Sequence, residues 1–284
     1  MSVKSLVKNN RSLYNLWLIY KNKYRVYLRI AKKNFLKIVD CNTDNKKLMV
    51  NIGGYHYFRR HWRILDNPSD HYSFKLGVLD YEHDLTDPKP FPLKDNSVSF
   101  FYTAHTIEHI PQEFCEHVFD EIYRCLKPGG AIRLTMPDFD LAYEAYGKYL
   151  KNNELDVDFL KQDYPEKTLE GQFLHFFASY LGDKESPEDV RNNYLNMKKE
   201  EFADYYTKKI PRESQKEFTG KHINWWNYEK LSNMLKNAKF TTVYRSNIQE
   251  SKFNELQGEG RDCGFDSTRP EISLFVEAVK EKSN

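Results

Sequence analysis

The sequence predicts an α/β protein built on an open, mostly parallel sheet. From residue 48 onward, short apolar runs alternate with turns and amphipathic stretches. The order strand, helix, strand across residues 98–136 favours parallel pairing, because parallel neighbours need a crossover connection that is usually a helix. With 284 residues, of which 40% are apolar, the chain is long enough to bury the core of such a sheet.

The first half of the sheet contains most of the predicted strands. Short apolar runs between turns are typical of buried strands, and they occur at residues 48–52, 62–66, 98–103 and 131–136. Residues 112–126 place Phe114, Val118 and Ile122 on one side of a helix. We expect this helix to stop at the sequence KPGG, since Pro128 and Gly129 cannot continue it.

The second half completes the sheet after a change of character. Residues 139–219 are polar, aromatic and predicted to be helical, and we interpret them as an insertion that acts as a substrate lid. A helix is expected at 226–238, a strand at 240–246 and a last, antiparallel strand at 271–280. The sheet domain is therefore predicted to comprise residues 48–138 and 220–284.

Residues 1–47 form a basic arm, with 12 Lys or Arg against 2 Asp or Glu, joined to a mildly acidic body. Residues 10–38 lack Gly and Pro and show helical spacing of apolar residues. The basic face is open to two interpretations, namely contact with an anionic membrane or nucleic acid, or ordinary packing. We favour packing against a sheet face left open by the short connection between residues 52 and 62, and we expect no nucleic-acid partner.

The cysteines and the potential metal ligands of the sequence indicate its cellular compartment and whether it binds a metal. The four cysteines show no CxxC pair, no apolar run approaches the length of a membrane span, and no signal peptide is evident. We therefore expect a cytoplasmic protein with reduced thiols. No group of His, Asp or Glu has the sequence spacing of a metal site, so no metal is predicted.

Residues 83–138 carry a combination of motifs: IEH after a strand, LKPGG after a helix, and then MPD. Together with the tail HINWWNYEKLSNMLKNAKF, this stretch resembles class I S-adenosylmethionine-dependent methyltransferases. The nearest group is the predicted methyltransferases found with bacterial polysaccharide biosynthesis. The resemblance implies a Rossmann-like methyltransferase sheet, S-adenosylmethionine as cofactor, and O-methylation of a saccharide or other small molecule.

The cofactor residues are expected directly after the strands, because ligands of open parallel sheets bind at the carboxyl ends. Asp66 follows the second strand, where a carboxylate can accept both ribose hydroxyl groups. By resemblance, Asp84 and Leu85 flank the adenine, and Thr103, Ala104 and His105 face the methionine part. The competing interpretation is that Asp66 and Asp84 only cap loops. The complete predicted set is Asn51, Gly53, Gly54, Tyr55, Asp66, Asp84, Leu85, Thr103, Ala104 and His105.

The loop after the first strand departs from the pattern D-x-G-x-G of the family. Asn51 stands in the acidic place and Tyr55 replaces a glycine, which gives up the backbone freedom of that position. These departures predict weakened cofactor contacts. They motivate an alternative function, in which a degenerate methyltransferase fold serves as a binding or scaffolding subunit.

Methyl transfer needs alignment and, for a hydroxyl acceptor, a base. The candidates are His105, His109, Asp138 and His222. Each has a structural alternative: Glu108 and His109 open the next helix, and His222 packs beside two Trp residues. A nucleic-acid methyltransferase is a third possibility, which the acidic body disfavours.

Overall fold

The computed structural model describes Tyr24, Ala31 and residues 47–54, 62–68, 79–153, 168–214, 220–257 and 270–282. Tyr24 and Ala31 are helical and exposed. The predicted packing of the helix at 10–38 on the sheet, and the predicted cofactor contact of Tyr55, lie outside the described residues.

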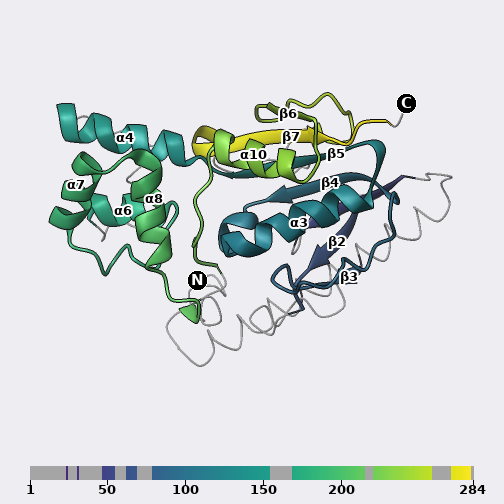
Figure 1. Ribbon diagram of the computed structural model, residues 1–284, viewed down its shortest axis with the longest axis horizontal. Helices are drawn as coiled ribbons and strands as arrows, with labels where there is room; N and C mark the ends of the chain where they lie inside the picture. Colours follow the sequence, from purple (N-terminus) through teal and green to yellow (C-terminus); the bar gives the residue numbers. More distant parts are fainter. Residues whose placement is uncertain are drawn as a thin grey trace, which may run out of the picture.

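A seven-stranded mixed sheet forms the centre of the protein (Figure 1), with the order β3-β2-β1-β4-β5-β7-β6. Neighbours from β3 to β5 pair in parallel, whereas β7 is antiparallel to both β5 and β6. This confirms the predicted α/β class, mostly parallel with an antiparallel last strand. The strands are β1 (Leu48–Ile52), β2 (Trp62–Asp66), β3 (Tyr81–Glu82), β4 (Val98–Ala104), β5 (Leu126–Pro137), β6 (Thr242–Arg245) and β7 (Ser273–Val279).

The KPGG sequence lies at the start of a strand. Helix α3 (Gln112–Cys125) ends just before it, and β5 begins at Leu126. A Cβ atom at Gly130 would lie 2.7 Å from the carbonyl oxygen of Ser99. The glycine is therefore needed because β5 closely approaches the backbone of β4.

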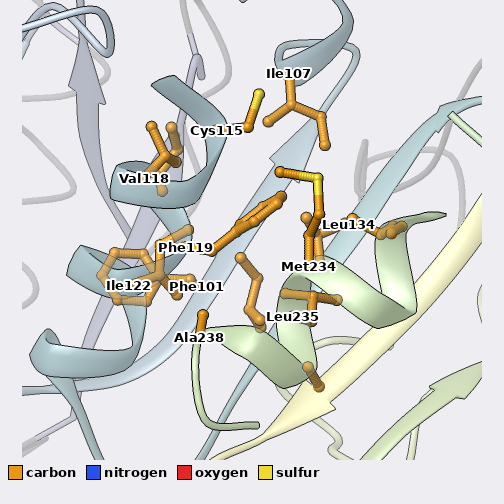
Figure 2. Close-up of a cluster of buried hydrophobic side chains, with 14 of the residues drawn as sticks. Phe101, Ile107, Cys115, Val118, Phe119, Ile122, Leu134, Met234, Leu235 and Ala238 are labelled. Carbon is orange, nitrogen blue, oxygen red and sulfur yellow. The ribbon is translucent and has the colours of Figure 1, made fainter. Parts of the chain in front are cut away.

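Helix α3 and α10 (Tyr228–Asn237) cover one face of the sheet (Figure 1). Figure 2 shows their apolar side chains meeting those of β4 and β5, with Phe119, Ile122 and Leu235 fully buried against Phe101 and Leu134. This spacing of apolar residues is what predicted both helices. Burial of these side chains supplies the main stabilisation of the sheet.

The chain between β5 and α10 forms a group of helices beside the sheet (Figure 1). They are α4 (Phe139–Asn152), α6 (Leu169–His175), α7 (Pro187–Asn196) and α8 (Lys199–Lys208). Their aromatic residues pack on one another: the rings of Tyr146 and Phe173 stack with centroids 4.5 Å apart, and Phe202 stacks on Phe173 at 5.6 Å. These three side chains are fully buried, so they form a core of this group of helices.

A smaller apolar cluster lies on the sheet itself, contributed by Met49, Trp62, Phe100 and Tyr102 and covered by Leu256. Two short one-turn helices, η2 (Ile107–His109) and η4 (Pro270–Ile272), complete the described elements. None of the described helices is both long enough and apolar enough to cross a membrane.

Candidate functional site

The turn after β1 is built from backbone alone. Gly53 has φ +70°, and a Cβ atom there would lie 2.2 Å from Thr106 Oγ1. Its amide donates to the carbonyl oxygen of Leu65, which ties the turn to β2 at 2.9 Å. Only glycine satisfies both the left-handed conformation and the close approach of Thr106. The turn therefore joins the carboxyl ends of β1, β2 and β4, with the side chain of Thr106 packed against Gly53.

Asn51 belongs to the same turn. Its side chain is buried, and a Cβ atom at Gly54 would lie 2.7 Å from Asn51 Nδ2. The amide group thus packs against Gly54. Replacing the acid of the family pattern by Asn removes a charge from a buried position, where an unpaired carboxylate is costly.

The two predicted carboxylates differ in their contacts. Asp66 ends β2, and its Oδ1 accepts from the amide of Asn67 at 2.8 Å. Asp84 is committed to its loop: Oδ1 accepts from the amide and the hydroxyl of Thr86, and Oδ2 accepts from Asn67 Nδ2 at 2.9 Å. Loop capping accounts for these contacts of Asp84, and neighbouring Leu85 packs in the main core. The adenine contact of this pair stays a prediction.

The end of β4 carries the most unusual backbone of the site. Thr103 is buried, and its hydroxyl has no hydrogen-bond partner within the described chain. After the half-buried Ala104, His105 adopts φ +48°, a left-handed conformation that is uncommon for a residue with a side chain. The amide of His105 donates to the carbonyl oxygen of Thr135 at 2.9 Å, which holds the turn against β5. Strained turns of this kind gather at functional sites.

That turn points the imidazole of His105 at a buried carboxylate. His105 Nδ1 lies 3.0 Å from Glu108 Oε1, with Glu108 1% exposed and the His105 side chain 33% exposed. Burial disfavours the charged form of Glu108. The hydrogen bond from His105 and the charges of the surrounding histidines outweigh this effect and lower its pKa to about 2. Glu108 is therefore a carboxylate that orients His105.

Two further histidines surround Glu108. His109 Nε2 lies 3.9 Å and His222 Nε2 4.0 Å from Glu108 Oε1, and the two rings are 4.9 Å apart between centroids. The distant segment is brought here because the amides of Ile223 and Asn224 donate to the carbonyl oxygen of Glu108. Burial, with the nearby His109, lowers the pKa of His222 to about 4. We call Glu108, His109 and His222 the Glu–His cluster.

The structure corrects the expected place of Glu108 and His109. They do not open the following helix but lie in η2, and α3 begins only at Gln112 after Pro111. Sequence reasoning missed Glu108 as a functional residue. The available signal was an acid between His105 and His109 in the sequence HTIEH, directly after a strand.

Asp138 contacts different elements. It caps α4, accepting from the amide of Asp140 at 3.0 Å, and Arg245 NH2 lies 3.5 Å from its carboxylate. Burial raises its pKa despite the charge of Arg245. Asp138 borders a groove of about 990 Å³, lined also by the connection from Tyr244 to Lys252 and by the start of β7. The structure thus separates Asp138 from the contacts of the three candidate histidines.

Residues 70–134 match the model of the family described as "Methyltransferase domain". This stretch of the chain is similar to methyltransferase domains, and it includes the strand end that presents His105 and the whole of α3. The match supports a class I, S-adenosylmethionine-dependent methyltransferase. The sequence-based prediction of this class and of its cofactor is confirmed; the narrower resemblance to polysaccharide-biosynthesis methyltransferases stays a prediction.

A curated relative matches a short part of the chain. Phosphoethanolamine N-methyltransferase 2 of Caenorhabditis elegans is 36% identical over 55 residues, which are 19% of this chain and 12% of the relative. This chain therefore corresponds to only a small part of that protein.

Solved methyltransferases resemble the chain only distantly. A possible histamine N-methyltransferase from Thermotoga maritima is 16% identical, with a TM-score of 0.38 over 92% of this chain and 96% of its own. An S-adenosylmethionine-dependent methyltransferase from Methanosarcina mazei is 14% identical, with a TM-score of 0.41 over 87% and 98%. Likeness at this level carries no argument about substrate.

Proposed function

We propose that the protein transfers a methyl group from S-adenosylmethionine to a hydroxyl group of a saccharide or another small molecule. The observation that carries the acceptor chemistry is the pair formed by His105 and the buried Glu108 at the carboxyl end of β4. A hydroxyl must lose a proton as it attacks a methyl group, and an oriented imidazole beside the cofactor is suited to accept it.

The residues after β1 and β2 fit the cofactor. The left-handed turn at Gly53 follows β1, and Asp66 supplies a carboxylate at the end of the neighbouring strand. In our proposal Asp66 accepts the ribose hydroxyl groups, and the end of β4 from Thr103 to His105 faces the methionine part. The bound cofactor supplies an electrophilic methyl group on a sulfonium.

His105 is placed to receive the proton. Nδ1 of His105 donates its hydrogen to Glu108, so Nε2 of the neutral ring carries the lone pair that can take a proton from the hydroxyl group being methylated. Glu108 acts as a positioning residue, since its ionised oxygen fixes the orientation of the ring. The left-handed turn at His105 is the backbone conformation that makes this pairing possible.

The acceptor would lie between the sheet and the helices α4, α6, α7 and α8, which we propose as the substrate lid. His222 joins the two parts: its Nδ1 bonds the carbonyl oxygen of Phe176 at 2.8 Å, and its amide donates to Ser179 Oγ at 2.7 Å.

An amine acceptor is the second candidate, favoured by the match to a phosphoethanolamine N-methyltransferase. A protonated amine must also lose a proton before it attacks, so the same imidazole would serve. The scaffolding alternative is motivated by Asn51, which fills the place next to Gly54.

Methyl transfer from labelled S-adenosylmethionine tests these assignments. The wild-type chain is incubated with saccharides, nucleotide sugars and small amines including phosphoethanolamine, and labelled products are identified by mass spectrometry. The proposal expects label on a hydroxyl group, and a roughly 10²- to 10⁴-fold lower turnover in His105→Ala. The matched control is His117→Ala, which removes a half-buried histidine of α3 whose Nε2 contacts the carbonyl oxygen of Lys89 at 3.1 Å. Label on nitrogen would favour the amine candidate, and undiminished turnover in His105→Ala would refute the role of His105.

A further inference from the structure

We propose that Glu108, His109 and His222 form a binding site for one divalent transition-metal ion, with zinc as the preferred ion. Among the described residues, these three present one carboxylate oxygen and two imidazole nitrogens within 4.8 Å of one another. The site adjoins the predicted cofactor edge but does not depend on the proposed methyl acceptor.

The distances suit a small coordination sphere. Glu108 Oε1 lies 3.9 Å from His109 Nε2 and 4.0 Å from His222 Nε2. Ligands of a tetrahedral zinc ion lie about 3.3 Å apart, given metal–ligand distances of about 2.0–2.1 Å. Closing the site around an ion therefore requires separations of up to 4.8 Å between the ligand atoms to shorten to about 3.3 Å.

Both imidazoles are already prepared for metal coordination. His109 Nδ1 bonds the carbonyl oxygen of Lys221 at 2.9 Å, and His222 Nδ1 bonds that of Phe176 at 2.8 Å. A carbonyl oxygen only accepts, so in each neutral ring the hydrogen is on Nδ1 and the lone pair is on Nε2, which faces Glu108. Metal-binding histidines are oriented by the same kind of second hydrogen bond.

Glu108 provides independent evidence for a missing ligand. Its side chain is 1% exposed, and its Oε2 has no hydrogen-bond partner in the described part of the chain. A buried carboxylate oxygen without a partner is costly. Oε1 accepts from His105, so in our proposal the ion is held by Oε2 or by both oxygens of the carboxylate.

The charge around the cluster also calls for a cation. The carboxylate of Glu108 is buried, with a side chain that is 1% exposed. A buried negative charge is stabilised by a paired cation. Two nitrogens and one oxygen form a mixed set typical of zinc, and three protein ligands leave a fourth position open for water or an acceptor oxygen.

The test is metal binding by the full chain after removal of metals with a chelator. Zn²⁺ is titrated calorimetrically into the wild type and into Glu108→Gln, His222→Ala and His117→Ala. The proposal expects one Zn²⁺ per chain in the wild type and in His117→Ala, and at least about 100-fold weaker binding in the two cluster variants. Equal binding by the wild type and Glu108→Gln, or no binding by either, would overturn the proposal.

A second measurement needs no variant and so does not depend on how the variants fold. Co²⁺ added to the wild-type chain should give visible absorption bands of a four- or five-coordinate site with nitrogen and oxygen ligands. Zn²⁺ should displace this signal with one equivalent. A spectrum of hydrated Co²⁺ alone, or a strong near-ultraviolet band from cysteine ligands, would contradict the assignment.

Discussion

The substitution Gly53→Ala tests the geometry of the turn at the predicted cofactor edge. Two costs follow from the structure. The φ of +70° places an alanine in the left-handed region, at about 1–2 kcal/mol. The new Cβ atom would also lie 2.2 Å from Thr106 Oγ1, and overpacking of this kind costs about 1–3 kcal/mol. We therefore expect the free energy of unfolding to fall by about 2–5 kcal/mol.

Urea denaturation followed by Trp fluorescence measures this change, and a double-mutant cycle with Thr106→Ala separates its two parts. Removing the Thr106 hydroxyl and methyl groups should recover about 1–2 kcal/mol of the loss, while the backbone cost remains. Gly54→Ala is the comparison for the steric part alone, because Gly54 lacks a positive φ but its new Cβ atom would lie 2.7 Å from Asn51 Nδ2. A loss below about 0.5 kcal/mol in Gly53→Ala, or no coupling to Thr106, would refute the reasoning.

Two further predictions concern buried charges. Glu277→Leu should lower the free energy of unfolding by about 3–5 kcal/mol, because Arg133 loses the carboxylate that lies 2.9 Å away in a pair whose side chains are both 0% exposed. In the same urea assay, the double variant with Arg133→Met should recover much of this loss. Equal losses in the single and the double variant would count against this account. Burial lowers the pKa of Lys230 from its ordinary 10.5 to about 8. Between these two pH values the unfolded chain binds more protons than the folded chain. The free energy of unfolding therefore contains a contribution that rises with pH across this window, by about 1–3 kcal/mol. Urea titrations at pH 7.5 and 10 should show a smaller rise in Lys230→Met than in wild type, and identical rises would contradict the assignment.

The strands could be predicted from sequence because each is a short apolar run between turns. Residues 48–52 and 62–66 coincide with β1 and β2. In α3, the helical spacing of apolar residues such as Val118 and Ile122 places one face of the helix against the core. The end of α3 before KPGG was predicted, but the start of β5 at Leu126 was not, because strand formation there depends on how closely β5 approaches Ser99. That approach is a property of the assembled sheet.

The Glu–His cluster could not be predicted for a different reason. His109 and Lys221, whose contact helps to build it, are 112 residues apart. Metal-site patterns in a sequence depend on ligands at short, regular spacing, whereas here a backbone contact to Glu108 brings His222 into place. The expectation of no metal was based on sequence spacing, which does not test ligands assembled by the fold, so it stays a prediction.

The most direct test of the central claim is calorimetric titration of S-adenosylmethionine and S-adenosylhomocysteine into the full chain. The account predicts micromolar binding of both by the wild type, its loss in Asp66→Ala, and its retention in Asp87→Ala, which removes a loop carboxylate paired with Lys89. No binding by the wild type, or equal binding by Asp66→Ala, would contradict a cofactor site at the ends of β1 and β2.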